Sequence, residues 1–281
     1  MSKMTKMLFF LGIFIFLLSI PFSVFAGTVG NTATLDAHRG PGIFSMKQDK
    51  NFYVKSAINA EFLYDRDIHA DAASNMELTR GEWFMTKLSC VVFNRFEPYI
   101  NLGMAHMKTR WTEAGTEVKL ESGTGFAWGF GGKGLIWEFE KPKIKIIGDA
   151  FYRMADLDVD EGTYSGSKVI MDSSKSRFLI REWQIAVLAA REIDISGPGK
   201  EDVLGVASII PYAGIKYSDI NGRLRLSWST GVYNNPGKIE ADNKFGLFAG
   251  CDFVGPSSVS VNVEGRFIDE TALTTGIAVM F

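Results

Sequence analysis

The stretch VSVNVEGRFIDETALTTGIAVMF, residues 259–281, decides the fold. From Val259 to Phe267 every second residue is apolar or glycine, and the residues between them are polar. After a break at residues 269–271 a second alternating segment begins, and it runs to Phe281. A side-chain period of two predicts β-strands with two unlike faces.

The same alternation recurs upstream, in segments of about the ten residues that a tilted membrane-spanning strand requires. We therefore predict an all-β fold: an antiparallel up-and-down transmembrane β-barrel of about ten strands, with eight or twelve as alternatives. The predicted strands cover residues 52–65, 81–93, 98–111, 125–139, 144–156, 178–193, 209–221, 244–254, 259–267 and 273–281.

The end of the chain resembles the C-terminal strand of bacterial outer-membrane β-barrel proteins. In that family a terminal Phe, preceded by apolar residues at alternate positions, is the signal that the barrel-assembly machinery reads. The matching residues here are Thr275, Ile277, Val279 and Phe281, of which Thr275 is the weakest match. The resemblance implies a bacterial outer-membrane location, but it does not identify an activity.

The connections between predicted strands alternate in length. Short turns are expected at 94–98, 140–143 and 255–258, and long polar links at 66–80, 112–124, 157–177 and 222–243. Barrels of this kind pair short periplasmic turns with long extracellular loops. Two connections depart from the rule: residues 194–208 are long for a turn, and residues 269–271 are short for a loop.

The alternative fold is a soluble two-sheet sandwich, whose polar rows would face water. Aromatic residues near the predicted strand ends favour the barrel instead, because such rings gather at membrane interfaces. This expected girdle comprises Tyr64, Trp83, Trp111, Trp128, Trp137 and Tyr152.

Composition narrows the function classes. A formal net charge of −2, with both signs spread along all 281 residues, gives no basic patch for nucleic acid. The 29 glycines and 13% aromatic residues suit closely packed, tilted strands with interfacial rings. Cys90 and Cys251 are the only cysteines, and both fall on predicted lipid-facing rows, so no disulfide framework is expected.

Residues 1–26 are predicted to be a secretory signal peptide. Lys3 and Lys6 precede an apolar run from Met7 to Ile20, and a cleavage pattern ends at Ala26. An uncleaved membrane anchor is the alternative. Residues 27–51 are expected to form a periplasmic lead-in, and residues 52–281 the barrel.

The inward-facing rows carry charges of both signs. The residues predicted to line the lumen are Lys55, Glu61, Lys87, Lys133, Lys145, Asp149, Arg153, Glu182, Lys216, Asp252, Glu264 and Arg266. Buried charges must be paired, because an unpaired one costs several kcal/mol. We expect ion pairs that fill the lumen; a narrow hydrated pore lined by these charges is the alternative.

Catalytic and metal motifs are weak. Omptin proteases share the barrel architecture and use an Asp-His dyad, for which His69 with Asp67 or Asp71 is only a loose parallel; His38 and His106 suggest no dyad. The acidic run Asp156, Asp158, Asp160 and Glu161 has oxygen ligands suited to Ca²⁺ but lacks the EF-hand glycine spacing. We expect no catalytic residue, cofactor or metal.

The sequence thus predicts a non-enzymatic, surface-exposed outer-membrane protein, with a porin-like diffusion channel second and a barrel enzyme third. The expected partners are outer-membrane lipid and lipopolysaccharide, together with the barrel-assembly machinery and periplasmic chaperones during biogenesis. No nucleic-acid partner is expected.

Overall fold

The computed structural model describes residues 52–70, 73–139, 143–169, 171–172, 175–195, 206–227, 237–255 and 259–281. The expected signal peptide and lead-in lie outside these residues. In the described part, no helix is long and apolar enough to cross a membrane. The strands are β1 (Phe52–Ala70), β2 (Ala73–Val92), β3 (Phe96–Glu113), β4 (Thr116–Ser122), β5 (Gly125–Phe139), β6 (Ile144–Tyr164), β7 (Ser167–Val169), β8 (Arg177–Arg191), β9 (Ile193–Asp194), β10 (Ser208–Arg225), β11 (Gly237–Ala241), β12 (Phe245–Val254), β13 (Val259–Phe267) and β14 (Thr271–Met280).

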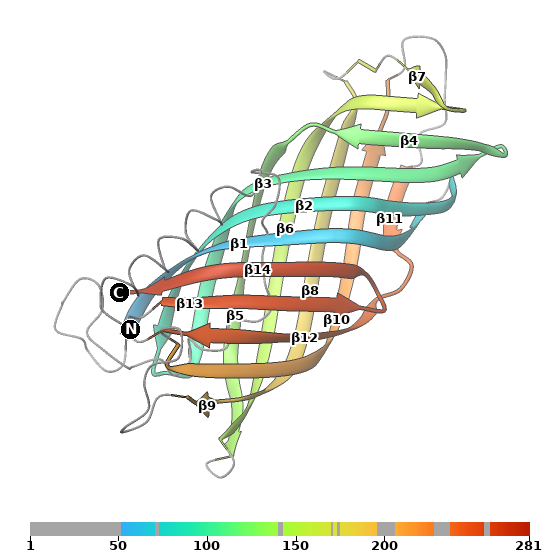
Figure 1. Ribbon diagram of the computed structural model, residues 1–281. Coiled ribbons are helices and arrows are strands. Elements are labelled where there is room, and N and C mark those ends of the chain that lie inside the picture. The colour runs from blue at the N-terminus through green and yellow to red at the C-terminus, as the bar shows by residue number, and fades with distance from the viewer. Residues whose placement is uncertain are drawn as a thin grey trace, which may run out of the picture.

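Ten of these strands close into an antiparallel ring, which we call the belt (Figure 1). The order around the belt is β1, β2, β3, β5, β6, β8, β10, β12, β13 and β14. The last strand pairs with the first, from Lys55 opposite Met280 to Asp65 opposite Thr271. The predicted ten-stranded barrel is confirmed, and the closed ring excludes the two-sheet sandwich.

Several strands are longer than the sequence predicted. The links expected at 66–80 and 112–124 are mostly strand, because β1 and β2 continue to residues 70 and 73, and β3 and β4 turn at Ala114–Gly115. Both turn residues have positive φ, which Gly115 adopts without strain. Alternation persists in these extensions, but their outward row turns polar, which made them resemble loops in the sequence.

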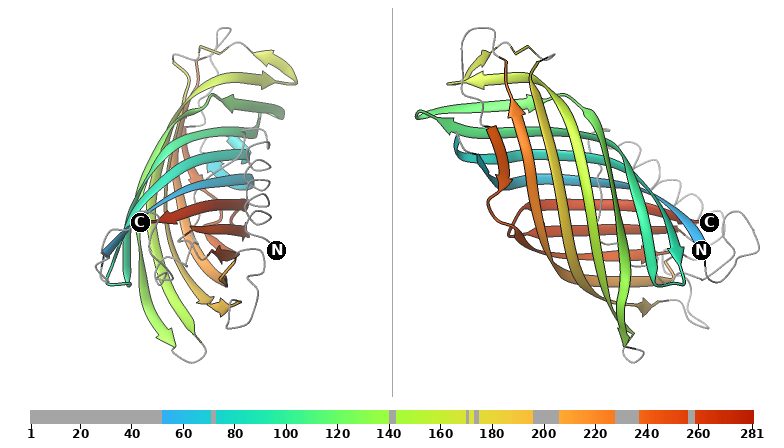
Figure 2. Two further views of the ribbon diagram at one scale, coloured as in Figure 1. Left: turned by 60° about the vertical axis from the view of Figure 1, so that its left-hand side comes forward. Right: turned by 180° about the vertical axis from the view of Figure 1, so that it is seen from behind.

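Above the belt the ring narrows to eight strands, and we call this part the collar. The short hairpin of β13 and β14 ends at residues 268–270, and β11 takes its place by pairing with β10 on one side and with β1 on the other. The collar ring comprises β1, β2, β3, β4, β6, β8, β10 and β11. The rear view in Figure 2 shows β11 beside the upper part of β10.

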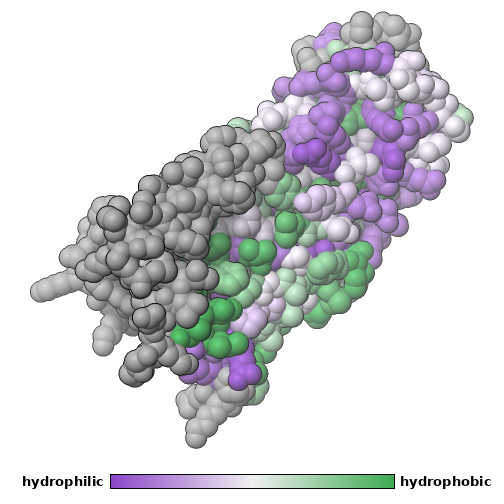
Figure 3. Space-filling model, viewed as in Figure 1, coloured by the Kyte–Doolittle hydropathy of each residue, from purple (hydrophilic) through white to green (hydrophobic). Residues whose placement is uncertain are grey.

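The outer wall changes character between these two parts. Outward side chains of the belt are apolar and exposed, for example Ile58, Ile185 and Leu247. Hydrophilic residues gather toward the collar end in Figure 3, and hydrophobic residues lie over the wall below it. An apolar outer band of this kind is what a membrane-spanning barrel presents to lipid.

A row of aromatic rings runs along the upper edge of the belt. Tyr152 lies 5.9 Å from Trp128, and Tyr217 lies 5.3 Å from Trp183 and 5.0 Å from Phe245, measured between ring centroids. We call these five residues the aromatic girdle.

Of the six rings expected at the interface, Trp128 and Tyr152 belong to this girdle. Tyr64 and Trp137 are exposed elsewhere on the outer wall, and the other two do not face outward. Trp83 and Trp111 are 2% and 1% exposed and point into the barrel. The outward neighbours Phe84 and Arg110 occupy the opposite phase of their strands, so the period of two puts both tryptophans inside.

Candidate functional site

The lumen of the belt is bridged by ion pairs. Arg66 on β1 lies 2.6 Å from Glu182 on β8, measured from Nη1 to Oε1. These strands are five places apart in a ring of ten, so the pair joins opposite walls. Both side chains are at most 3% exposed. This contact crosses the bore near the junction of the belt and the collar.

A second chain of contacts crosses the lumen at the same level. The Glu61 carboxylate on β1 lies 2.7 Å from Arg153 Nη2 on β6 and 2.9 Å from Arg266 Nη1 on β13. Arg153 also donates to Glu182 at 2.6 Å, and its guanidinium stacks 4.1 Å from the Trp83 ring centroid. Such charge-assisted, desolvated contacts fix the side chains in one arrangement.

The tip of the β13–β14 hairpin completes this central ion network. Asp269 and Glu270 are buried and point inward, where both carboxylates meet Lys216 Nζ, at 2.8 Å for Asp269. Glu270 also lies 3.0 Å from Arg66 and 3.2 Å from Arg266. A connection that seemed too short for an outer loop is therefore an inward-facing part of the lumen.

A lower network lies nearer the chain ends. Glu97 Oε1 lies 2.9 Å from Lys87 Nζ and 3.3 Å from Lys55 Nζ. Tyr99 donates to Asp149 at 2.8 Å. On the opposite side of the barrel, Asn262 donates to Asp252 and to the Tyr212 hydroxyl, and that hydroxyl donates to Glu264 at 3.0 Å. Each of these groups has at least one buried polar partner, although Asp149 Oδ2 and Asn262 Oδ1 accept no hydrogen bond within the described residues.

All twelve side chains proposed for the lumen are buried inside the barrel, each 9% exposed or less. Their assignment as a functional site stays a prediction. The structure adds Arg66, Glu97, Asp269 and Glu270 to the same interior. The sixteen residues comprise eight cations and eight anions, so their formal charges cancel.

The reasons for missing these four residues are local. A bulge between Leu63 and Asp65 reverses the phase of β1, which turns Arg66 inward although the plain period of two places it outside. Glu97 was assigned to a turn, and Asp269 and Glu270 to a break between strands. The positive φ of Ile268, 85°, marks the turn that aims both carboxylates inward.

The collar is filled by an apolar core instead of ions. Its largest members include Trp111, Phe178, Leu157 and Ile180, each 2% exposed or less. Eight strands enclose a bore that side chains just fill. Within the described residues, small voids of about 20 and 10 Å³ lie at the levels of Lys87 and Arg66, each with room for about one water molecule.

Glycines on the inner wall make room for rings. A Cβ added at Gly131 would lie 2.6 Å from the Tyr99 ring, and one at Gly250 would lie 2.4 Å from the Tyr212 ring. Both tyrosines are members of the lower network, so these glycines are needed for the lumen to close.

The histidines that the structure describes face outward. His69 lies opposite Glu240, and no hydrogen bond joins it to Asp67 among the described residues; Asp71 and His38 lie outside them. His106 Nε2 lies 3.3 Å from Glu121. Burial alone would raise the pKa of Glu121, but the hydrogen bonds and charges of Lys108 and His106 together outweigh it and hold that pKa below its ordinary value. These contacts belong to the collar's outer wall.

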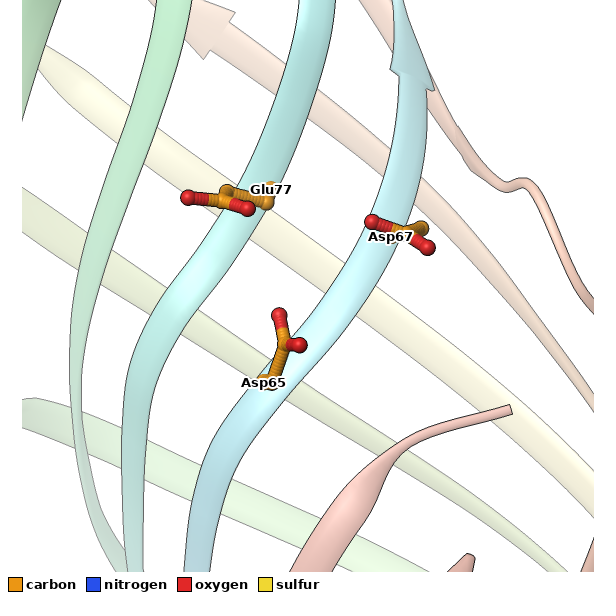
Figure 4. Close-up of side chains that lie close together, drawn as sticks. All are labelled: Asp65, Asp67 and Glu77. Carbon is orange, nitrogen blue, oxygen red and sulfur yellow. The ribbon is translucent and has the colours of Figure 1, made fainter. Parts of the chain in front are cut away.

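Acidic residues on the outer wall are the candidate metal ligands. Oxygens of Asp65, Asp67 and Glu77 lie within 4.8 Å of one another, with Glu77 facing Asp67 from the neighbouring strand (Figure 4). Glu77 is already paired with Arg110. The acidic run that begins at Asp156 lies on strand β6 and not in a loop, and Arg177 lies 3.1 Å from Asp156.

Comparisons with solved structures find barrels of the same general kind. The chain is similar to the translocator domain of autotransporter NalP from Neisseria meningitidis, with 9% identity and a TM-score of 0.39, over 83% of this chain and 89% of that one. It is also similar to the transport unit of the autotransporter AIDA-I from Escherichia coli, with 9% identity, a TM-score of 0.31 and coverage of 84% and 91%.

A third similar structure is the outer membrane protease OmpT from Escherichia coli, with 10% identity, a TM-score of 0.34 and coverage of 82% and 95%. No protein-family model and no curated protein matches the chain. At these TM-scores the likeness adds nothing to the fold, which the strand pairing establishes by itself.

Proposed function

We propose that this protein is an integral, non-enzymatic barrel of the bacterial outer membrane whose lumen is closed by its own side chains. The observation that carries the proposal is the 2.6 Å contact between Arg66 and Glu182, which joins opposite walls of the belt. The apolar core of the collar adds a second barrier at the outer end. In this role the wall anchors the collar, which presents its polar surface outside the membrane.

The decisive experiment is conductance in planar lipid bilayers. Inserted wild-type protein is expected to show no steady ion current, because buried ion pairs cross the lumen of the belt and an apolar core fills the collar. Folding of the same preparation is checked by its heat-dependent gel mobility, so that an absence of current can be attributed to a closed barrel and not to unfolded protein. A reproducible open channel would overturn the proposal in favour of the porin-like alternative.

The orientation is tested separately with a thiol reagent that cannot cross membranes. Thr112 lies on the outward wall of the collar, in β3. In intact cells Thr112→Cys is expected to be labelled, whereas wild type, whose Cys90 and Cys251 lie on the lipid-facing wall of the belt, is not. Labelling of Thr112→Cys only after lysis would place the collar inside the cell envelope and contradict the proposal.

A further inference from the structure

A groove of about 670 Å³ lies on the outer wall of the collar, between β8, β10 and β11. Four cationic side chains line it: Arg181 from β8, Arg223 and Arg225 from β10, and Lys238 from β11. All four are exposed. Its volume lies within the ~300–1,000 Å³ range of small-molecule sites.

Three of these cations are available to a ligand. Within the described residues, Arg181, Arg223 and Arg225 have no ion-pair or hydrogen-bond partner. The nearby carboxylates are engaged elsewhere: Glu240 pairs with Lys238, and Asp219 lies 3.1 Å from Lys244. The groove therefore holds an excess of positive charge, and it fits an anion.

The height of the groove indicates where that anion comes from. Arg181 precedes the girdle residue Trp183 by two positions along β8, on the same outward face, and so lies about 7 Å farther toward the collar end. Tyr217, also in the girdle, lies below Arg223 on the same face of β10. Aromatic girdles lie at the level of lipid headgroups. The arginines thus lie where headgroup phosphates begin.

We propose that this groove binds the phosphate groups of a phosphorylated glycolipid in the surrounding outer leaflet, the chemistry that lipopolysaccharide presents. Guanidinium groups suit this ligand because their planar donors bind phosphate oxygens in pairs. The proposal rests on the outer-membrane location proposed above, and it assigns one specific face of the barrel to the lipid.

The test is lipid binding by purified, detergent-solubilised protein. Fluorescent lipopolysaccharide is titrated onto wild type, onto the double variant Arg181→Gln/Arg223→Gln and onto Arg191→Gln. Arg191 is a matched control, since it lies on the same outward row of β8 at the opposite end of the barrel. We expect the double variant to bind at least about tenfold more weakly and the control to equal wild type. Gel mobility of unheated samples confirms that each variant is folded.

Further arms identify the ligand chemistry. Lipopolysaccharide stripped of its lipid phosphates should bind wild type as weakly as the phosphorylated form binds the double variant. Equal affinity of wild type and the double variant would overturn the proposal. Wild type that bound inorganic phosphate but no glycolipid would overturn it too, in favour of a free-phosphate site.

Failure of this inference can be told apart from failure of the proposed function. A conducting barrel that still binds phosphorylated glycolipid through the groove would refute only the closed lumen. A closed barrel with no difference between Arg181→Gln/Arg223→Gln and Arg191→Gln would refute only the groove.

Discussion

The belt and the collar solve the problem of filling a barrel in opposite ways. The belt has ten strands, an apolar outer wall and a lumen of buried ion pairs. The collar has eight strands, a polar outer wall and an apolar interior. Inside and outside exchange character at the girdle. The apolar wall of the belt suits lipid, and the polar wall of the collar suits water. The wider bore of the belt is filled by ion pairs, and the narrower bore of the collar by apolar side chains.

The junction between the two parts depends on the C-terminal hairpin. β12, β13 and β14 are 10, 9 and 10 residues long, close to the length that spans a membrane, while β1, β2 and β6 are about twice as long. Because the hairpin stops at the junction, its Asp269 and Glu270 fold into the bore at the level where the number of strands falls from ten to eight.

Breaking the belt's ion network should cost most. Arg266→Ala removes a buried cation that lies 2.9 Å from Glu61 and 3.0 Å from Glu264, so we expect it to lower the free energy of unfolding by about 3–5 kcal/mol. Urea unfolding of the protein folded into lipid vesicles measures this. A loss below about 1 kcal/mol would show that the network is not desolvated.

Truncating the collar's core should cost nearly as much for a different reason. Phe178→Ala removes a ring that is 2% exposed and leaves a cavity, with an expected loss of about 3–5 kcal/mol. Sulfate distinguishes the loss caused by Phe178→Ala from the loss caused by Arg266→Ala. The loss caused by Phe178→Ala is expected to grow in sulfate, which strengthens apolar burial and so stabilises the wild type more than the variant. A loss of unfolding free energy that did not change with sulfate would argue against a water-free interior of the collar.

The outer walls should differ in their tolerance of charge. Val261→Arg places a cation on the lipid-facing row of the belt and should destabilise the barrel by about 2–4 kcal/mol near the midplane. Thr112→Arg, on the outward row of the collar beside Glu117, should cost less than about 0.5 kcal/mol. Equal costs would mean that the membrane does not end at the girdle.

Packing of the inner wall can be probed with one methyl group. Gly131→Ala forces a Cβ to within 2.6 Å of Tyr99, and we expect a loss of about 1–3 kcal/mol. Gly134→Ala on the same strand is the control, because its nearest neighbour beyond the adjacent residues is Phe96 at 3.9 Å. Similar unfolding curves for both variants would indicate that the lumen is loosely packed around Tyr99.

Surface pairs of the collar should matter least. Arg177 reaches Asp156 at 3.1 Å, but both side chains are largely exposed to water. Arg177→Ala is expected to change the free energy of unfolding by less than about 1 kcal/mol. A larger change, measured under the same urea conditions as Arg266→Ala, would show that the exposed pair of the collar stabilises the fold as much as a buried pair of the belt.

Much of the belt could be predicted from the sequence. The boundaries of β5 and β13 and the two faces of β6, from Ile144 outward to Arg153 inward, follow from the period of two. That period is strong wherever one face meets lipid and the other meets charge. It predicts orientation residue by residue, but it says nothing of which residue meets which across the bore.

The collar could not be predicted in the same way. Its outward row is polar, so segments such as residues 66–80 read as loops, although Ile68 and Met76 continue the inward row. The bulge before Arg66 and the inward turn after Ile268 are set by tertiary contacts. The pairing of β11 with β1 joins segments about 170 residues apart, and no local pattern encodes it.

One consequence of the two closures concerns how the chain folds. The same edge of β1 pairs with β14 in the belt and with β11 in the collar. Neither of these two pairings can form until residues beyond 236 have been synthesised. Closing loops of this length is slow, because their entropy must be spent before any contact forms. Until then one edge of β1 is unpaired and partly apolar, and it can pair wrongly with another chain. Of the described strands, β1 is thus the first to be synthesised and among the last to be paired at both its edges.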